Sequence, residues 1–287
     1  ATFTIEDTTA PAVVDAMDAT VECDGAGNVA DLDAWLASNG GASATDACSG
    51  VTWSNDFDAL SDDCGATGAA TVTFTATDDC GNATSTTATF TIEDTTAPAV
   101  MDAMDATVEC DGAGNAADLD AWLASNGGAS ATDACSGVTW SNDFAALSDA
   151  CGATGAATVT FTATDDCGNA SSTTATFTIE DTTSPTRDSE AMDATVECDG
   201  AGNAADLNAW LANNGGASAT DACSGVTWSN DFAALSDACG ATGAATVTFT
   251  ATDECGNATS TTATFTIEDT TAPAVVDAMD ATVECDG

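Results

Sequence analysis

Clustered acidic residues in this chain have the types and spacing that a metal ion needs. The segments 93–94, 133–135 and 165–169 each carry acids, in one case with an asparagine, and equivalent segments recur along the sequence. Calcium binds six to eight oxygen atoms from carboxylates and amide carbonyls, and it needs neither histidine nor thiolate. If such segments meet at one junction, their carboxylates repel one another unless a cation neutralises them. The sequence therefore predicts calcium, with these ligands: Glu6, Asp7, Asp46, Asp78, Asp79, Asn82, Glu93, Asp94, Asp133, Asp165, Asp166, Asn169, Glu180, Asp181, Asp221, Asp253, Glu254 and Asn257.

A simpler interpretation of the same residues stays open, because aspartate and asparagine also favour turns. The sequence contains no EF-hand spacing. A second metal candidate, weaker than the first, is the segment 24–28 with Asp31, where helix capping by Asn28 is the better explanation.

Cysteines form the second group of chemically capable residues. The first copy of the repeat has four, at 23, 48, 64 and 80, and the thirteenth cysteine of the chain, Cys285, begins a further copy. The absence of histidine and of any Cys-x-x-Cys motif argues against zinc, so we expect disulfides formed in an oxidising compartment. Four cysteines allow three pairings within a repeat.

The choice among these pairings follows from the expected sandwich. The loops that carry Cys48 and Cys80 should share one end of it, and Cys23 and Cys64 should share the other end. The predicted disulfides are Cys23–Cys64, Cys48–Cys80, Cys110–Cys151, Cys135–Cys167, Cys198–Cys239 and Cys223–Cys255.

These residues are positioned by a tandem repeat. The phrase Thr-Phe-Thr-Ile-Glu-Asp-Thr-Thr begins at residues 2, 89, 176 and 264, so the period is 87 or 88 residues. Each copy then reaches a proline, which suits a short, stiff junction. The predicted domains are repeats at 10–96, 97–183 and 184–271, with the last strand of a preceding repeat at 1–9 and the first strand of a following repeat at 272–287.

Alternating apolar residues predict strands inside each repeat. The segments 71–77 and 87–92 place valine, phenylalanine, alanine and isoleucine on one face and threonine on the other, which indicates a hairpin with one buried face. Shorter strands are expected at 19–23, 42–45 and 51–54.

Between these strands, Leu32, Trp35 and Leu36 have helical spacing, so a short helix is expected within 28–39, ended by the glycines that follow it. Trp53 is expected to anchor the core. The predicted fold class is all-β: tandem immunoglobulin-like sandwich repeats of about 87 residues, each with a short helical insert, arranged as beads on a string.

The charge of the chain excludes several classes of function. Forty-seven acidic residues stand against one basic residue, Arg187, which gives a formal net charge of −46. Nucleic-acid binding needs lysine and arginine, so no nucleic-acid partner is expected. No apolar stretch is long enough to insert into a membrane. The lack of histidine and lysine, and of any cleft-forming insertion, gives no support for an enzyme. Solubility in a salty medium is the alternative explanation of the acidity.

The stretch 73–82, followed by 90–98, resembles the HYR-like, immunoglobulin-related repeats of large secreted bacterial surface proteins, especially those of Bacteroidota. That resemblance implies an extracellular, cell-surface protein with an adhesive or structural role. The chain departs from the family in its near lack of basic residues and in its helical insert. The acids at the junctions resemble the calcium-stiffened linkers of cadherins.

Two functions are therefore expected in order of preference. The first is a structural or adhesive array, a rod or filament stiffened by calcium and disulfides, whose partners are neighbouring repeats and other copies of itself in a fibre. The alternative is a multivalent module that binds glycans or ice through its threonine rows. The Asp-Thr-Thr phrases also resemble O-glycosylation acceptors of Bacteroidota, at Thr8, Thr95, Thr182 and Thr270.

Overall fold

The structure is a computed structural model that describes residues 1–236 and 238–284. Cys285 and the last residues of the predicted segment 272–287 lie outside this part. The chain divides into two compact units. The first comprises Ala1–Thr107, Ala117–Leu147 and Ala156–Thr178, and the second comprises Val108–Ala116, Ser148–Gly155 and Ile179–Gly287. Each unit contains one junction between consecutive repeats. The first, second and third repeats are the residues 10–96, 97–183 and 184–271 of the sequence.

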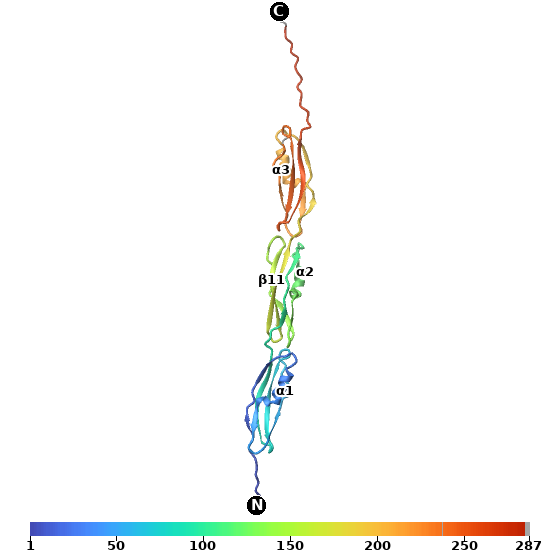
Figure 1. Ribbon diagram of the computed structural model, residues 1–287. Helices are drawn as coiled ribbons and strands as arrows, with labels where there is room; N and C mark the ends of the chain where they lie inside the picture. The colour runs from blue at the N-terminus through green and yellow to red at the C-terminus, as the bar shows by residue number, and fades with distance from the viewer. Residues whose placement is uncertain (237, 285–287) are drawn as a thin grey trace. The chain divides into compact units, whose positions relative to one another are not determined.

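The first repeat has a short helix beside its strands (Figure 1). Its elements in chain order are β1 (Ala12–Val14), β2 (Ala19–Glu22), α1 (Val29–Ala37), the 3-10 turn η1 (Asn39–Gly41), β3 (Ser43–Thr45), β4 (Val51–Asn55), β5 (Gly68–Asp78) and β6 (Ala83–Glu93). The predicted strands are all present, and the hairpin strands β5 and β6 extend beyond their predicted ends. Strand β1 was not predicted, because three residues are too few to show a period.

The strands of the first repeat form two sheets. The larger has the order β2-β6-β5-β4, and the smaller pairs β1 with β3. Strand β2 runs parallel to β6, which places Glu22 opposite Glu93 at the end of the pair. The other pairings are antiparallel. The same order of strands recurs in the third repeat, so the prediction of all-β repeats of about 87 residues with one short helix each is confirmed.

The core lies on one face of the β5–β6 hairpin. Val72, Phe74 and Phe90 are almost completely buried there. On the other face, the hydroxyl oxygens of Thr71 and Thr89 lie 2.9 Å apart across the two strands. The predicted division into a buried apolar face and a solvated threonine face is confirmed.

Trp35 of helix α1 covers this core. Its ring packs edge-on against Phe74 with 5.2 Å between the ring centroids, and its indole N–H donates to the carbonyl of Met17. Trp53, which we expected to be the anchor, packs only at the margin of the core. The reason is that β4 is an edge strand, so Trp53 has a neighbouring strand on one side only.

Asn28 does not cap helix α1 as predicted. Its backbone is left-handed, with φ of 48°, and its side chain makes no capping hydrogen bond. Instead, its Nδ2 donates to the carbonyl of Glu22 and its Oδ1 accepts from the backbone N–H of Asp24. Asn28 thus fixes the loop between β2 and α1. The predicted end of the helix is confirmed, because the chain turns at Asn39–Gly41.

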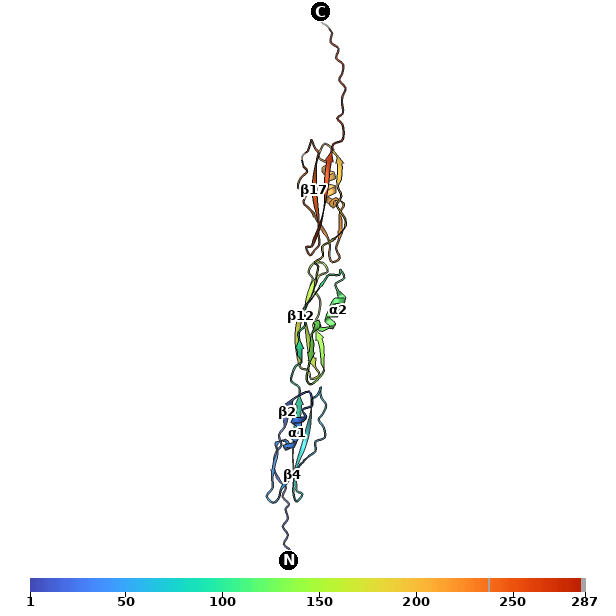
Figure 2. The same ribbon diagram turned by 45° about the vertical axis from the view of Figure 1, so that its right-hand side comes forward.

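The second and third repeats contain equivalent elements, and Figure 2 shows their helices and strands from a second direction. These elements are β7 (Ala99–Met101), β8 (Ala106–Glu109), α2 (Ala116–Ala124), η2 (Asn126–Gly128), β9 (Ser130–Thr132), β10 (Val138–Asn142), β11 (Gly155–Asp165), β12 (Ala170–Glu180), β13 (Thr186–Ser189), β14 (Ala194–Glu197), α3 (Ala204–Ala212), η3 (Asn214–Gly216), β15 (Ser218–Thr220), β16 (Thr227–Asn230), β17 (Gly243–Thr252) and β18 (Ala258–Glu268). Within the described residues, no helix combines the length and the apolar character needed to cross a bilayer.

Candidate functional site at the repeat junctions

Two disulfides join each pair of consecutive repeats. In the first unit, Cys23 is bonded to Cys135 and Cys64 is bonded to Cys167, with Cα–Cα distances of 6.0 and 5.3 Å. These distances lie in the usual range for disulfides. The bonded residues are 112 and 103 positions apart in the sequence. In the second unit the equivalent bonds are Cys110–Cys223 and Cys151–Cys255. Consecutive repeats are therefore linked three times, by the peptide chain and by two disulfides.

The predicted pairings within a repeat are wrong for this structure. None of Cys23–Cys64, Cys48–Cys80, Cys110–Cys151, Cys135–Cys167, Cys198–Cys239 and Cys223–Cys255 is formed. The placement of the cysteines at the ends of the repeat was nevertheless correct. The sulfur of Cys23 lies 3.8 Å from the carbonyl of Ala66, two residues from Cys64. The partners differ because the two cysteines at one end of a repeat meet the two at the facing end of the next.

Two glycines allow the facing loops to approach closely. A Cβ atom on Gly25 would lie 2.3 Å from the carbonyl oxygen of Ala134, and one on Gly65 would lie 2.3 Å from that of Cys135. Both glycines have positive φ, 77° and 59°. The N–H of Ala66 donates to the carbonyl of Cys135 at 2.9 Å, which adds a backbone hydrogen bond across the junction. Only glycine combines this backbone conformation with this contact.

Glu22 anchors the peptide linker at the end of β6. Its carboxylate accepts hydrogen bonds from the N–H and hydroxyl of Thr95 and from the hydroxyl of Thr96, at 2.6 to 2.9 Å. These bonds lower the pKa of Glu22, and the bond from the Thr96 hydroxyl has the largest effect. Glu109 and Glu197 hold the next linkers in the same way. Sequence reasoning missed this residue, because its role depends on the parallel pairing that brings Glu22 beside Glu93, which no local pattern in the sequence indicates.

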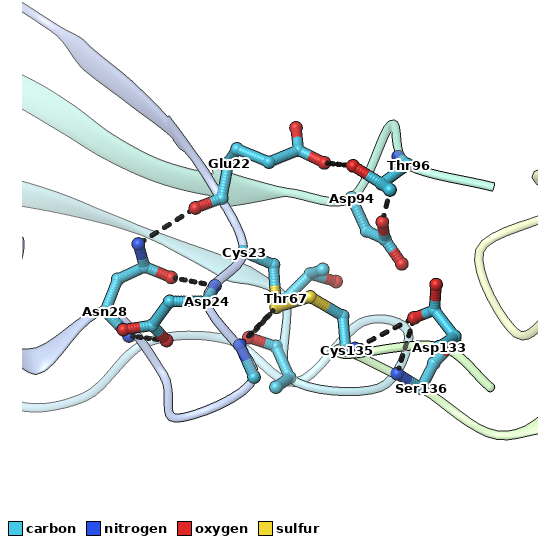
Figure 3. Close-up of a disulfide and its surroundings, with 12 residues drawn as sticks. Glu22, Cys23, Asp24, Asn28, Thr67, Asp94, Thr96, Asp133, Cys135 and Ser136 are labelled. Atoms are coloured by element: carbon cyan, nitrogen blue, oxygen red, sulfur yellow. Dashed lines mark hydrogen bonds between the residues drawn. A yellow bond between two sulfur atoms is a disulfide. The ribbon is translucent and has the colours of Figure 1, made fainter. Parts of the chain in front are cut away.

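Asp94 and Asp133 form the centre of the acidic cluster, and their side chains point toward one another (Figure 3). One carboxylate oxygen from each lies within 4.8 Å of the other and of the Cys135 sulfur. Asp94 Oδ1 accepts from the N–H of Thr96 at 3.1 Å. Asp133 Oδ1 accepts from the N–H groups of Cys135 and Ser136 at 2.8 and 3.1 Å. The predicted convergence of these two acids is therefore present.

One oxygen of Asp94 is buried without a partner. The residue is only 9% exposed, and Oδ2 has no hydrogen bond to any of the described residues. Burial raises the pKa of Asp94, and the charges of Asp133, Asp165 and Glu22 raise it further. Asp181 in the second unit repeats the arrangement, with 8% exposure and an unpartnered Oδ2. A buried carboxylate oxygen that no donor satisfies is costly unless a proton, a cation or a water molecule satisfies it.

Asn169 and Asp165 support this centre from the neighbouring turn. The side-chain amide of Asn169 donates to the backbone carbonyl of Asp94 at 3.0 Å and to Asp165 Oδ2 at 2.9 Å. Burial on its own would raise the pKa of Asp165, but the hydrogen bonds from Asn169 and from the backbone of Gly168 and Cys167 together lower that pKa. Asn82 and Asn257 make the equivalent bonds to the carbonyls of Asp7 and Asp181.

Other predicted ligands do not join Asp94 and Asp133 in the acidic cluster. Glu93 and Glu180 are exposed at the ends of their strands, and Glu6 is exposed in a segment that forms no strand. Asp166 Oδ2 accepts from the N–H of Gly137, and Glu254 accepts from the N–H of Gly152 in the preceding repeat. These groups position loops instead. Asp79 makes the same bond to Gly50 that Asp166 makes to Gly137.

The residues present fit a hard divalent cation. Asp94 and Asp133 would supply carboxylate oxygens, and water would complete the six to eight oxygen ligands that calcium takes. The sulfur of Cys135 belongs to a disulfide, so it offers no thiolate. The equivalent acids in the second unit are Asp181 and Asp221, and Asp7 with Asp46 repeats the pair in the first repeat.

Two further predictions are affected by the hydrogen bonds. Asp24 Oδ1 accepts from the N–H groups of Ala26 and Asn28 at 2.7 and 3.0 Å, so the weaker metal candidate at 24–28 is explained by a hydrogen-bonded loop.

The hydroxyl of Thr95 donates to Glu22, and those of Thr182 and Thr270 donate to Glu109 and Glu197. Glycosylation of these threonines stays a prediction, and it would require the loss of these bonds.

No family model matches the sequence, and no curated protein matches it. Solved structures that this chain matches include mouse cadherin-23 repeats EC22–24, with 13% identity, a TM-score of 0.29 and coverage of 91% of this chain and 99% of that one. The protocadherin gamma-B4 extracellular domain has 14% identity, a TM-score of 0.26 and coverage of 69% and 38%, so this chain spans well under half of it. Drosophila N-cadherin EC1–4 has 12% identity, a TM-score of 0.27 and coverage of 79% of this chain and 68% of that one. Identities and TM-scores this low do not assign the chain to the cadherins.

Proposed function

We propose that the chain is a cross-linked spacer of a secreted or cell-surface protein, which holds two extracellular elements at a limited separation under tension. The observation that carries this proposal is the pair of disulfides at each repeat junction. Disulfides persist in oxidising, extracellular compartments. The resemblance to HYR-like repeats of bacterial surface proteins supports the same location and a structural or adhesive role.

The order of the disulfides limits how far the chain can be stretched, even when every repeat has unfolded. The shortest covalent path between its ends runs through residues 1–23, 135–151 and 255–287, crossing Cys23–Cys135 and Cys151–Cys255. That path contains about 70 residues, or roughly 250 Å at about 3.5 Å per residue. Without disulfides, the extended chain would reach roughly 1,000 Å. Such a ladder resists overextension, which suits a spacer.

Calcium is the second part of the proposal. Bound between Asp94 and Asp133, it would neutralise two facing carboxylates and satisfy the unpartnered oxygen of Asp94. The cation would thereby stabilise the linker against bending at the junction. Thermal unfolding of the oxidised chain in calcium and then in EGTA measures this contribution. A melting temperature that is the same in both would contradict the calcium sites and leave the disulfide ladder standing.

Force spectroscopy on single molecules tests the spacer. The chain is held through fused terminal tags, and its final extension after unfolding is measured before and after reduction. We expect roughly 250 Å for the oxidised chain and roughly 1,000 Å after reduction. An oxidised extension of roughly 600 Å would correspond to disulfides within each repeat and would overturn the proposal.

A further inference from the structure

Arg187, the one basic side chain of the sequence, bridges two acceptors on the surface of the third repeat. It lies on β13, and its guanidinium donates a hydrogen bond to the backbone carbonyl of Ser260 on β18. The other terminal nitrogen of the same group lies 3.4 Å from the carboxylate of Glu190. The planar fork of a guanidinium suits such a pair of acceptors, because it presents several N–H groups in fixed directions.

The Ser260 carbonyl can accept this bond because the strand edge beside it is open. Strand β18 pairs with β17 along its whole length on one side. On the other side, β14 pairs only with Phe265–Glu268 of β18. Ser260 precedes that stretch, so its backbone is left for a side-chain donor.

The second repeat has the same acceptors without the arginine. The equivalents of Glu190 and Ser260, 88 positions earlier, are Asp102 and Ser172. They line a pocket of about 390 Å³, together with Ala103, Thr173 and Thr174. This volume lies within the range of ligand pockets. Asp102 is exposed and, among the residues that the structure describes, takes part in no ion pair.

A valine takes the place of the arginine in the second repeat. Val100 pairs with Ala131 in the strand register, as Arg187 pairs with the equivalent Ala219. The third repeat also has an extra residue, Asp188, at a shift in that register. Valine has no donor, so no side chain at this position reaches the acceptors of the second repeat.

The first repeat matches the second in each of these respects. Val13 pairs with Ala44 at the register position of Arg187. The equivalents of the two acceptors are Asp15 and Ser85. Two repeats therefore present an open form of a site that a guanidinium fills in the third.

We propose that the pocket beside Asp102 binds an arginine side chain of a basic partner protein, placed as Arg187 is placed in the third repeat. The equivalent site beside Asp15 binds a second arginine. In the third repeat, Arg187 occupies the site itself and excludes the partner. The proposal depends on neither the disulfides nor calcium.

The charge of the chain favours a basic partner. A net charge of −46 attracts cationic proteins and accelerates their encounter with the chain. Arginine is preferred to lysine, because an ammonium is a compact charge without the fork that reaches both acceptors. One exposed ion pair contributes little. The partner is held firmly only when its arginines occupy the pockets of several repeats at once.

Peptide binding to the whole oxidised chain tests the proposal. The probes are two fluorescein-labelled peptides, one with three arginines and one with three lysines, separated by glycines. Fluorescence anisotropy is measured in EGTA at about 0.15 M salt, where general electrostatic attraction is screened. We expect the arginine peptide to bind about fivefold more tightly than the lysine peptide, because only the guanidinium bridges both acceptors. Equal affinity for the two peptides would overturn the proposal.

A pair of double variants separates the pockets from the general acidity of the chain. Asp15→Asn with Asp102→Asn should remove most of the preference for arginine. Asp33→Asn with Asp120→Asn is the matched control, since it removes the same charge from exposed positions on α1 and α2. The control should keep the preference, and an equal loss in both proteins would overturn the proposal.

The third repeat provides a test by gain of binding. Added to the Asp15→Asn and Asp102→Asn protein, Arg187→Val should restore the preference for arginine, because it frees Glu190 and the Ser260 carbonyl. Valine already occupies this register position in the other repeats, so the strand should be retained, and the melting temperature checks this. A further Glu190→Gln should remove the preference again. If Arg187→Val restores nothing in a protein that melts like its parent, the proposal is wrong.

Discussion

Asp94 and Asp133, 39 positions apart in the sequence, bring their carboxylate oxygens within 4.8 Å of each other at the first junction. Because the folded-state pKa of Asp94 is raised, the stabilising effect of this group is complete below the unfolded pKa of about 3.9 and is lost as pH rises through the folded value. At pH 7 without a divalent cation, the ionised carboxylate therefore destabilises the junction.

Asp94→Asn should consequently raise the melting temperature in EGTA at pH 7 and reduce the further rise on adding calcium. A change of about 1 kcal/mol moves the melting temperature of a domain this size by about 4–8 °C. Asp120→Asn is the matched control, since it removes the same charge from an exposed position on α2. Equal calcium responses in the two variants would contradict a cation at Asp94.

The disulfide pattern predicts how many thiols two double variants release. In Cys23→Ser with Cys64→Ser, the partners Cys135 and Cys167 lose their bonds, so two additional thiols should react with a maleimide in denaturant. In Cys23→Ser with Cys135→Ser, no additional thiol should react. Pairing within repeats would give the opposite result in both proteins, and intact mass after labelling distinguishes the two patterns.

The second of these variants also measures what one cross-link contributes. Closing a loop of about 100 residues stabilises by about 4–5 kcal/mol on the chain-entropy model. With Cys64–Cys167 intact, Cys23–Cys135 closes a loop through residues 23–64 and 135–167, about 75 residues, so we expect its removal to lower the free energy of unfolding by about 4 kcal/mol. A negligible change would show that the cross-link is not formed in the native protein.

Gly25 and Gly200 provide a test of the close contact with its control in the same chain. Both have φ near 77°, where alanine costs about 1–2 kcal/mol. Gly200→Ala should lower the free energy of unfolding by only that amount, because its Cβ would meet no described atom within 4 Å. Gly25→Ala should lower the free energy of unfolding by more, because its Cβ would lie 2.3 Å from the backbone carbonyl oxygen of Ala134.

The readouts for this pair are the melting temperature and the yield of the Cys23–Cys135 bond after oxidative refolding. The bond should form less completely in Gly25→Ala, because the two loops that carry its cysteines are pushed apart. Equal losses in the two glycine variants would mean that the junction is looser than the structure has it.

Much of one repeat could be predicted from the sequence, because its periods are local. The alternation around Phe74 and the spacing of Leu32 and Trp35 placed the hairpin and the helix. The ends at which Cys23 and Cys64 lie followed from the order of strands. Their partners did not, since a disulfide to the next repeat depends on the faces that two repeats present to each other, which no period within one repeat encodes.

The acidic residues at the junctions show the same difference between local patterns and long-range contacts. Asp94 was predicted because it sits in a linker beside turns rich in aspartate. Glu22 was missed because it ends an ordinary strand, and its role arises only from the parallel pairing of β2 with β6. Residues that act through their own local spacing were found, and residues that act through a long-range pairing were not.

Glu22 leads to a prediction about pH. Its folded pKa is lowered, chiefly by the hydroxyl of Thr96, so its stabilising effect is present above the unfolded pKa of about 4.3 and is lost as pH falls through the folded value. In Glu22→Gln, measured in EGTA, the melting temperature should be lower at pH 7, and this deficit should disappear as the pH falls below about 4. Thr96→Val should reproduce part of this loss of melting temperature, because it removes the hydrogen bond that lowers the pKa of Glu22 most.

Glu93→Gln is the control for that experiment. Glu93 lies opposite Glu22 in the strand register, it is exposed, and no hydrogen bond of its carboxylate is seen among the described residues. Its replacement removes the same charge from the same end of the sheet, so it reports the general electrostatic repulsion of this acidic chain. If both variants follow one pH curve, the linker is held by something other than Glu22. If only Glu22→Gln departs from the parent, the carboxylate fixes the linker that delivers Asp94 to the junction.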